Sequence, residues 1–381
     1  MTHDGFSPSQ PLLAPLPVSL TGCLSSADAA ATRKAFADLI YGSLPTAPAT
    51  PWKVYDDVAF DPTPIPGAGA LQRLMIGPIG DGRTRVPVLL AMPARYTVGK
   101  PVPVILGLCR GPLAAVLHHP DWTVAGAPEI PDPRDCAGGQ AMHWSLSVPL
   151  AAGIAVAIME ADRFAPDDVT AGRGVGFAPH DDGLSGALSR WAWGLMRLVD
   201  VLTTYDRVDR DRLWLFGHSR RGKAALWAAA HDPRIAAVIA HQSGCLGAAL
   251  NRHPVGETVR QIVDRFPHWF RPDLAERADR PEAWAVDQHQ LLALIAPRRL
   301  LISNGVEDCW ADPVGQGIAL TAAAPAWQHP APAPPKPSHL SVTGALGHLV
   351  LPGGHRCGPD YWRLFCQFLI GVSVHHGDLV A

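Results

Sequence analysis

A serine, a carboxylate and a histidine in the C-terminal half of the chain have the types and the order that ester hydrolysis requires. Ser219 lies in the run GHSRRGK, after the apolar run LWLF and before AALWAAA, which is rich in strong helix formers. A strand, a tight turn with serine at its apex and a helix together form a nucleophile elbow. The helix N-terminus behind the serine offers backbone N–H groups to a developing oxyanion. The pattern therefore predicts Ser219 as a nucleophile, and the alternative is a serine that only caps the helix.

The turn departs from the usual G-x-S-x-G pattern at one position. Its second glycine falls one residue late, at Gly222, and Arg221 takes the expected place. A bare G-x-S match is a weak signal, so the prediction depends on the strand before it, the helix after it and partners further along the chain.

The partners of Ser219 are predicted from chain order. In α/β-hydrolases the nucleophile is followed by an acid and then by a histidine, each on a loop after a strand. Here Glu307 and Asp308 follow the strand-like run Arg299–Ser303, and His355 follows Leu349–Leu351. We expect His355 to be the base. Asp308, three residues after Gly305, is the predicted acid, with Glu307 as the alternative; either could instead be surface charge on a loop.

The elements that position these residues alternate between strand and helix. The runs VYDDVAF, LQRLMIG and RVPVLLAMP predict an antiparallel edge, and PVPVILGL predicts a central parallel strand. We predict an irregular N-terminal segment over residues 1–30 and a single catalytic domain over residues 31–381. Its predicted fold is the α/β-hydrolase fold, a three-layer α/β sandwich with a mostly parallel central sheet.

Several further segments carry expectations of their own. A helix is predicted near Ala29–Tyr41, from apolar residues at helical spacing. The loop Cys109–Gly139 follows an early central strand and is expected to carry the second oxyanion donor, near Arg110 and Gly111. The segment Asn251–Pro272 is expected to form a lid over the site. The run PAPAPPKP is expected to be a polyproline-like surface insertion.

Composition excludes several classes of function. With 48% hydrophobic and 17% charged residues, the 381-residue chain is globular, and a net charge of -2 without basic blocks makes nucleic acid a poor partner. No apolar run reaches the roughly 20 residues of a membrane span. The seven cysteines form no C-x-x-C pair and no Cys/His spacing typical of zinc sites. His118-His119 likewise has no further ligand residues at a recognised metal-binding spacing. We therefore expect neither a metal nor an organic cofactor.

The chain resembles the glucuronoyl esterases of carbohydrate esterase family 15, especially the bacterial branch. The resemblance extends from about Ala31 to Phe368 and is carried by the elbow and by the runs HQSGC, GETV, FPHWF, DQHQLLALIAPR and EDCWADP. Ser-Arg followed by Gly-Lys is this family's own form of the elbow. The resemblance implies cleavage of the ester that joins a glucuronic acid of xylan, often 4-O-methylated, to an alcohol of lignin.

The same resemblance implies roles for other residues. Arg220 matches an arginine that supports the oxyanion through its backbone N–H and its guanidinium, although it could instead form a surface salt bridge. Lys223 matches a ligand of sugar hydroxyls. Trp310 matches the aromatic residue that lines the uronate pocket, where the alternative is simple core packing. Glu257 lies near a position that binds sugar hydroxyls.

One position departs from the family pattern. Some members carry the triad acid as a glutamate directly before Ser-Gly, where this chain has Gln242. A neutral amide does not stabilise an imidazolium as a carboxylate does, so the acid is expected on the later loop. The loop Cys109–Gly139 also differs in sequence from what the family would lead us to expect. This leaves open the shape of the pocket for the alcohol, and with it activity on bulky lignin esters.

Two alternative functions remain open at this point. One is a carboxylesterase or acetyl-sugar deacetylase of the same fold, and the other is a carbohydrate-binding relative without catalysis. We expect a monomer. Family habit favours a secreted or periplasmic protein, but no ordinary signal peptide is visible. Leu20–Cys23 resembles a lipoprotein cleavage box, yet prolines interrupt the preceding segment. The compartment is therefore left open.

Overall fold

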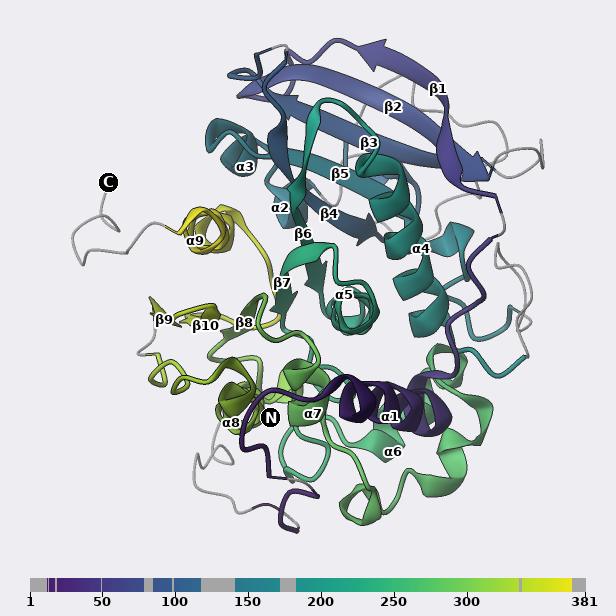
Figure 1. Cartoon of the computed structure of the whole chain (residues 1–381), viewed down its shortest axis with the longest axis vertical. Helices are drawn as coiled ribbons and strands as arrows, with labels where there is room; N and C mark the ends of the chain where they lie inside the picture. The colour runs from purple at the N-terminus through teal and green to yellow at the C-terminus, as the bar shows by residue number, and fades with distance from the viewer. Residues whose placement is uncertain are drawn as a thin grey trace.

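A mixed sheet runs through the molecule and positions everything else. The computed structural model describes residues 12, 14–17, 19–48, 50–78, 85–97, 99–117, 141–171, 183–335 and 338–371. Within these ranges the sheet has ten strands in the order β1-β2-β3-β5-β4-β6-β7-β8-β10-β9 (Figure 1). The strands are β1 Trp52–Phe60, β2 Ala68–Pro78, β3 Val86–Pro93, β4 Val102–Cys109, β5 Ala155–Glu160, β6 Val208–His218, β7 Ile235–His241, β8 Arg299–Gly305, β9 His339–Thr343 and β10 Leu346–Leu351.

The pairing of the strands matches the predicted arrangement. β1, β2 and β3 pair antiparallel and form the predicted antiparallel edge, and β3 also pairs antiparallel with β5. From β5 the sheet continues in parallel through β4, β6, β7, β8 and β10, and β9 closes it antiparallel. β3, β4 and β5 are almost entirely buried, as apolar strands covered on both faces must be. The α/β prediction is confirmed.

Helices cover both faces of the sheet and make three layers. On one face α1, α4, α5, α6, α7 and α8 contribute to a large apolar core, and on the other α2, α3 and α9 contribute to a second core. Figure 1 shows α9 and α3 across the sheet from α4 and α5. The helices are α1 Ser26–Phe36, α2 Ala141–Trp144, α3 Ser147–Ala151, α4 Ala187–Leu202, α5 Arg220–His231, α6 Val259–Arg265, α7 Gln288–Ala293, α8 Pro313–Ala323 and α9 Pro359–Ile370.

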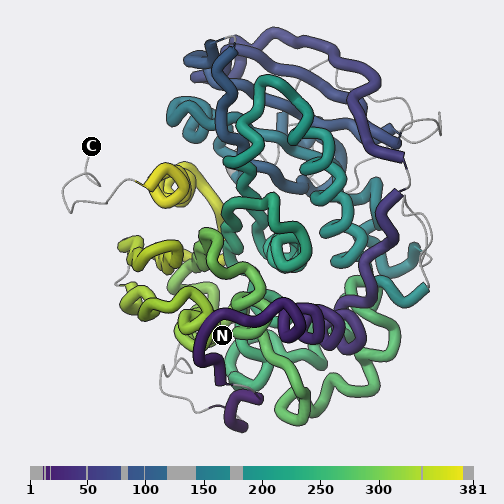
Figure 2. The backbone as a smooth tube through the Cα atoms, in the orientation of Figure 1, coloured from purple at the N-terminus to yellow at the C-terminus, as the bar shows by residue number. Residues whose placement is uncertain are grey.

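The N-terminal segment runs along the surface of the first core. Leu16, Leu20 and Leu24 pack against that core, and Figure 2 shows this segment beside the green part of the chain. The guanidinium of Arg252 donates a hydrogen bond to the carbonyl oxygen of Pro15. The predicted domain boundary at residue 30 stays a prediction.

The observed elements differ from the expectations at several places. The first helix begins at Ser26, because Ser25 caps it by accepting a hydrogen bond from the Asp28 N–H. α8 and β9 were not predicted, because α8 begins with a proline and a glycine-rich turn and β9 lies half-exposed at the sheet edge. In PAPAPPKP, residues 330–335 have no regular secondary structure, and residues 336–337 lie outside the described ranges. The described ranges contain no helix long and apolar enough to cross a membrane.

Three histidines, two buried and one partly buried, are expected to make stability fall in mild acid. Burial lowers the pKa of His241 to about 3 and those of His231 and His348 to about 4, from an ordinary 6.5. Below about pH 6.5 the unfolded chain therefore binds protons that the folded chain does not. The free energy of unfolding thus falls as the pH decreases toward about 4. The fall is at most about 1.4 kcal/mol per pH unit for each histidine. Urea unfolding between about pH 7 and pH 5 measures this slope.

A substitution in β10 isolates the contribution of one of these histidines. His348→Met removes one titrating group from the core, so we expect a shallower pH slope. The control is His329→Met, whose side chain is only partly buried and lies outside the regular secondary structure. Equal slopes in the wild type and in His348→Met would contradict the prediction.

Candidate active site

Ser219 occupies a strained turn between β6 and α5. Its backbone has a φ of 56° and a ψ of -127°, an uncommon conformation for a residue other than glycine. The Ser219 N–H donates to the carbonyl oxygen of His241 at 2.8 Å, which ties the turn to the end of β7. A side chain at Gly217 would place its Cβ 2.2 Å from the carbonyl oxygen of Arg221. The tight strand-to-helix turn therefore requires glycine at position 217.

The displaced second glycine has a packing role inside the first turn of α5. A Cβ at Gly222 would lie 2.9 Å from the carbonyl oxygen of Gly217 and 3.0 Å from the Cβ of Ser243. Arg221, at the usual glycine position, is buried, and its guanidinium lies 4.1 Å from the Trp191 ring centroid. The first turn of α5 thus packs against the elbow at Gly222, and it packs against α4 through the side chain of Arg221.

The candidate acid and base lie in contact. The Nδ1 of His355 lies 2.7 Å from the Oδ2 of Asp308, whose side chain is buried, while that of His355 is 44% exposed. Because the carboxylate accepts, Nδ1 carries the proton and Nε2 is left to receive one. Glu307 is exposed and contacts the same loop through its backbone N–H, which donates to the Gly353 carbonyl oxygen at 3.0 Å.

The strand order explains why these residues converge. Ser219 follows β6, Gln242 follows β7, Asp308 lies in the loop after β8, and His355 lies in the loop after β10. These strands are parallel neighbours, so their carboxyl ends lie side by side at one edge of the sheet. Ligands and catalytic groups of open α/β sheets collect at this edge.

Imidazole rings pack around His218, the residue before Ser219. The ring centroid of His218 lies 4.6 Å from that of His355, 5.0 Å from that of His241 and 5.2 Å from that of His143. Burial, together with the neighbouring histidines, lowers the pKa of His218 well below its ordinary value. Within the described ranges, no three His, Cys, Asp or Glu side chains are grouped so as to hold a metal ion.

Arg220 is held by an acid that the sequence did not single out. Its Nη1 donates to the Oδ2 of Asp167 at 2.8 Å, and its guanidinium lies 4.2 Å from the Trp269 ring centroid and 4.9 Å from that of Phe266. The Phe266 and Trp269 rings are stacked at 3.8 Å. The segment predicted as a lid therefore contacts the residue that directly follows Ser219.

Asp167 is the common partner of several groups. Its Oδ1 accepts from the Trp269 indole at 2.7 Å, and its other oxygen accepts from Arg221 at 3.3 Å as well as from Arg220. Burial alone would raise the pKa of this carboxyl, but the charge of Arg221 and the other partners hold it well below its ordinary value. Asp167 comes from an irregular stretch after β5, where no spacing or motif marks it.

Lys223 lies one turn along α5 and is buried. Its Nζ donates to the backbone carbonyl oxygens of Ser243 and Cys245. Burial lowers its pKa, and the nearby carboxylate of Glu257 opposes this shift. An ammonium has three N–H donors, so one remains for another partner.

Glu257 and Trp310 lie on adjoining loops. The Glu257 N–H donates to the Trp310 carbonyl oxygen at 2.9 Å. A Cβ at Gly256, whose φ is 77°, would lie 2.7 Å from the same oxygen, so glycine permits this close approach. The Trp310 side chain is 49% exposed, which is unusual for a large apolar residue and offers a surface for a flat partner.

The other expected features near the site are described in part. Arg110 and Gly111 follow β4, and the charge of Arg110 acts on Arg220. The expected oxyanion donor in this loop stays a prediction, since residues 118–140, which include His118-His119, lie outside the described ranges. The six cysteines within those ranges are free thiols.

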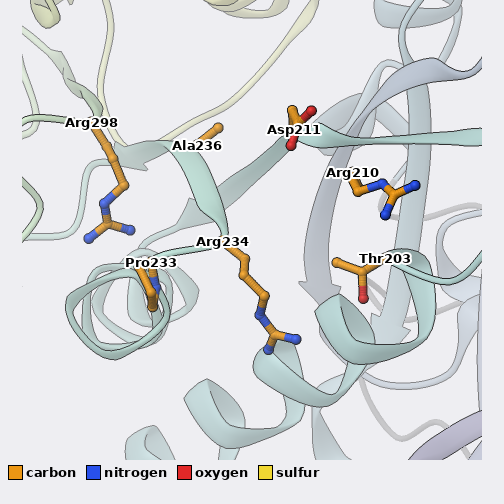
Figure 3. A pocket seen from close by; sticks show the side chains of 7 residues that line it. All are labelled: Thr203, Arg210, Asp211, Pro233, Arg234, Ala236 and Arg298. Carbon is orange, nitrogen blue, oxygen red and sulfur yellow. The ribbon is translucent and has the colours of Figure 1, made fainter.

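A depression of about 530 Å³ lies at the opposite edge of the sheet (Figure 3). It is lined by Thr203, Arg210, Asp211, Pro233, Arg234, Ala236 and Arg298. Arg298 donates to carbonyl oxygens, including those of Asp232 and Ile235, and Arg234 pairs with Asp232 and Asp200. The charge of Arg234 is thus neutralised by carboxylates of the chain, and the donors of Arg298 are taken up by backbone carbonyl oxygens. The depression lies at the edge where the parallel strands begin.

Comparisons with known proteins agree on one family. The family model described as "Glucuronyl esterase, fungi" matches residues 138–330, just over half of the chain. Among curated proteins, carbohydrate esterase MZ0003 from an unknown prokaryotic organism is 34% identical over 244 residues, 61% of this chain and 56% of that protein. The 4-O-methyl-glucuronoyl methylesterase of Hypocrea jecorina is 32% identical over 246 residues, 60% of this chain and 51% of that protein. The chain thus aligns with about half the length of the curated relatives.

Solved structures resemble the whole fold. An esterase of carbohydrate esterase family 15 from a marine bacterial metagenome has a TM-score of 0.82 and 27% identity, over 96% of this chain and 99% of that one. The glucuronoyl esterase of Solibacter usitatus has a TM-score of 0.79 and 28% identity, over 93% of this chain and 97% of that one. These matches establish the α/β-hydrolase type of fold. Since the family model also spans the elbow and the candidate acid, this chain belongs to the glucuronoyl esterases of carbohydrate esterase family 15.

Proposed function

We propose that this protein is a serine-type carboxylic ester hydrolase that cleaves 4-O-methyl-glucuronoyl esters between xylan and lignin alcohols. The observation that carries the proposal is the 2.7 Å contact between His355 and the buried Asp308, beside the strained elbow that presents Ser219. Family membership supplies the substrate class. Curated relatives are named 4-O-methyl-glucuronoyl methylesterases.

The proposed reaction is acyl transfer in two steps. The Oγ of Ser219 attacks the uronoyl carbonyl carbon, and the Nε2 of His355 takes the hydroxyl proton. Asp308 stabilises the imidazolium, which then gives the proton to the departing alcohol oxygen. Water, activated by the same histidine, hydrolyses the acyl-enzyme and releases the uronic acid.

Arg220 supplies the proposed stabilisation of the oxyanion. Its backbone N–H lies at the start of α5, directly after the nucleophile, where this fold places an oxyanion donor. Its guanidinium adds a fixed positive charge, since Asp167, Phe266 and Trp269 restrain it. Losing one such donor typically costs about 10²–10³-fold in kcat.

The uronate sugar is proposed to bind between α5 and the two loops beside it. The remaining N–H of Lys223 and the carboxylate of Glu257 would take the sugar hydroxyls, and the exposed face of Trp310 would stack on the ring. A simple acetyl esterase has no need for such a set of sugar ligands.

A panel of esters tests the substrate class. We expect benzyl and methyl glucuronates to be hydrolysed with a higher kcat/KM than aryl acetates and acetylated xylan oligomers, because only the uronates use the sugar ligands in the transition state. The same panel with Lys223→Met should lose about tenfold or more on the uronates and little on the acetates. A preference for short acetates would overturn the uronate assignment.

We further propose that the protein acts as a monomer. One chain supplies the nucleophile, the base, the acid and the sugar ligands, so catalysis requires no residue from a second copy. Light scattering of the purified protein at assay concentration tests this, and a stable dimer would contradict it. The net charge of -2 offers no general attraction to nucleic acid.

A further inference from the structure

A buried glutamine lies among the loops that carry the candidate triad. Gln242 directly follows β7 and is 1% exposed. Its backbone N–H donates to the carbonyl oxygen of Ser303 on β8 at 2.7 Å, and its φ is 49°. A positive φ is uncommon for a residue other than glycine and costs conformational energy. The fold therefore holds this side chain in a defined place at the active edge of the sheet.

Both ends of its amide are in use, and each end contacts a neighbour of a catalytic residue. The Nε2 donates to the carbonyl oxygen of Gly354 at 2.8 Å, and Gly354 directly precedes His355. The Oε1 lies 2.9 Å from the Nε2 of His218, which directly precedes Ser219. An amide oxygen only accepts, so the His218 Nε2 carries the proton and donates it.

The third loop of the candidate triad packs against the same amide. A Cβ at Gly305, the last residue of β8, would lie 2.9 Å from the Gln242 Nε2 and 2.5 Å from the Gly354 carbonyl oxygen. Gly305 also accepts from the Asp308 N–H at 3.2 Å. The absence of a side chain at Gly305 thus lets one amide lie between the acid loop and the base loop.

We infer that Gln242 is a positioning residue for ester hydrolysis, which fixes the base loop and the residue before the nucleophile relative to each other. The inference rests on the proposed function, since it concerns the same reaction. Gln242 holds the Gly354–His355 backbone by donating, and holds His218 by accepting. His218 in turn packs its ring against that of His355.

This role requires an amide in place of a carboxylate. A glutamate of the same length would keep an acceptor for His218 but would put an oxygen against the Gly354 carbonyl oxygen, where two acceptors repel. An apolar side chain would leave a buried N–H and a buried carbonyl without partners, at a cost of about 1–3 kcal/mol each. The glutamine therefore suits a chain whose acid comes from the later loop at Asp308.

Two substitutions at this position test the inference. Gln242→Met keeps the size and removes both hydrogen bonds, and Gln242→Glu removes only the donor. Gln328→Met and Gln328→Glu are the matched controls, because Gln328 also has a positive φ, of 60°, but is exposed after the helical turn Ala324–Trp327. Each variant is assayed on the best ester of the wild type, and active sites are counted by labelling Ser219 with a fluorophosphonate.

We expect kcat per labelled serine to fall about 10–100-fold in Gln242→Met and about tenfold in Gln242→Glu, with KM within about threefold, because misplacing a base by about 1 Å costs rates of this order. The Gln328 variants should match the wild type. A merely structural role would lower the labelled fraction or the melting temperature and leave kcat per labelled serine unchanged.

The inference is overturned if kcat per labelled serine stays within about twofold of the wild type in Gln242→Glu, or if the whole loss falls on KM. Failure of the proposed substrate class is a separate outcome. The rate of fluorophosphonate labelling needs the elbow and His355 but no sugar, so it reports on Gln242 even when aryl acetates prove to be the better esters.

Discussion

Replacing Ser219 with alanine is expected to lower kcat for ester hydrolysis by about 10⁴-fold or more, since removal of a serine nucleophile disables the whole triad. The elbow supplies the physical reason. The turn fixes Ser219 at a φ of 56° and anchors its N–H to His241, which holds its side chain in one place. Because alanine has no hydroxyl, it forms no acyl-enzyme.

The measurement is steady-state hydrolysis of benzyl glucuronate, together with labelling by a fluorophosphonate. Ser219→Ala should lose both the turnover and the label, while its melting temperature stays close to that of the wild type. Ser341→Ala, on the edge strand β9, is the matched control and should keep both. Undiminished turnover in Ser219→Ala would refute the assignment of the nucleophile.

Replacing Asp308 with asparagine is expected to cause the second-largest loss of activity, a fall in kcat of about 10³–10⁴-fold. Asp308 is buried and accepts from the Nδ1 of His355 at 2.7 Å, so its charge acts on the imidazolium with little screening. An asparagine amide removes that charge and also permits the wrong imidazole tautomer.

Glu307→Gln is the matched control for that experiment. It makes the same change from acid to amide one residue earlier, on an exposed side chain. We expect its kcat to stay within about threefold of the wild type, as most surface substitutions leave the fold and its chemistry intact. A larger loss in Glu307→Gln than in Asp308→Asn would move the acid to Glu307.

The sequence was most informative where chemistry and chain order coincide. The nucleophile elbow, the parallel strands and the convergence of Asp308 with His355 follow from a local strand–turn–helix pattern and from strand ends that share one edge of a sheet. The choice of Asp308 over Glu307 as the partner of His355 also agrees with the contact in the structure.

The sequence was least informative where function depends on distant side chains without a periodic pattern. Asp167 lies more than fifty residues before Arg220, in an irregular stretch, and only the fold brings the two together. The stacking of Phe266 and Trp269 beside Arg220 likewise depends on tertiary structure. At Gln242 the sequence indicated a missing acid, but the two partners of its amide become visible only in three dimensions.

The first turn of α5 has a consequence for the redesign of this protein, if the proposed activity holds. Ser219, Arg220 and Lys223 belong to one short stretch, and Lys223 is bound at its tip to the carbonyl oxygens of Ser243 and Cys245. The distance between the proposed nucleophile and the proposed sugar ligand Lys223 is therefore set by helical geometry. Libraries that seek new sugars should vary the loops at Glu257 and Trp310 and leave residues 217–223 unchanged, because a change in the helix would alter recognition and chemistry together.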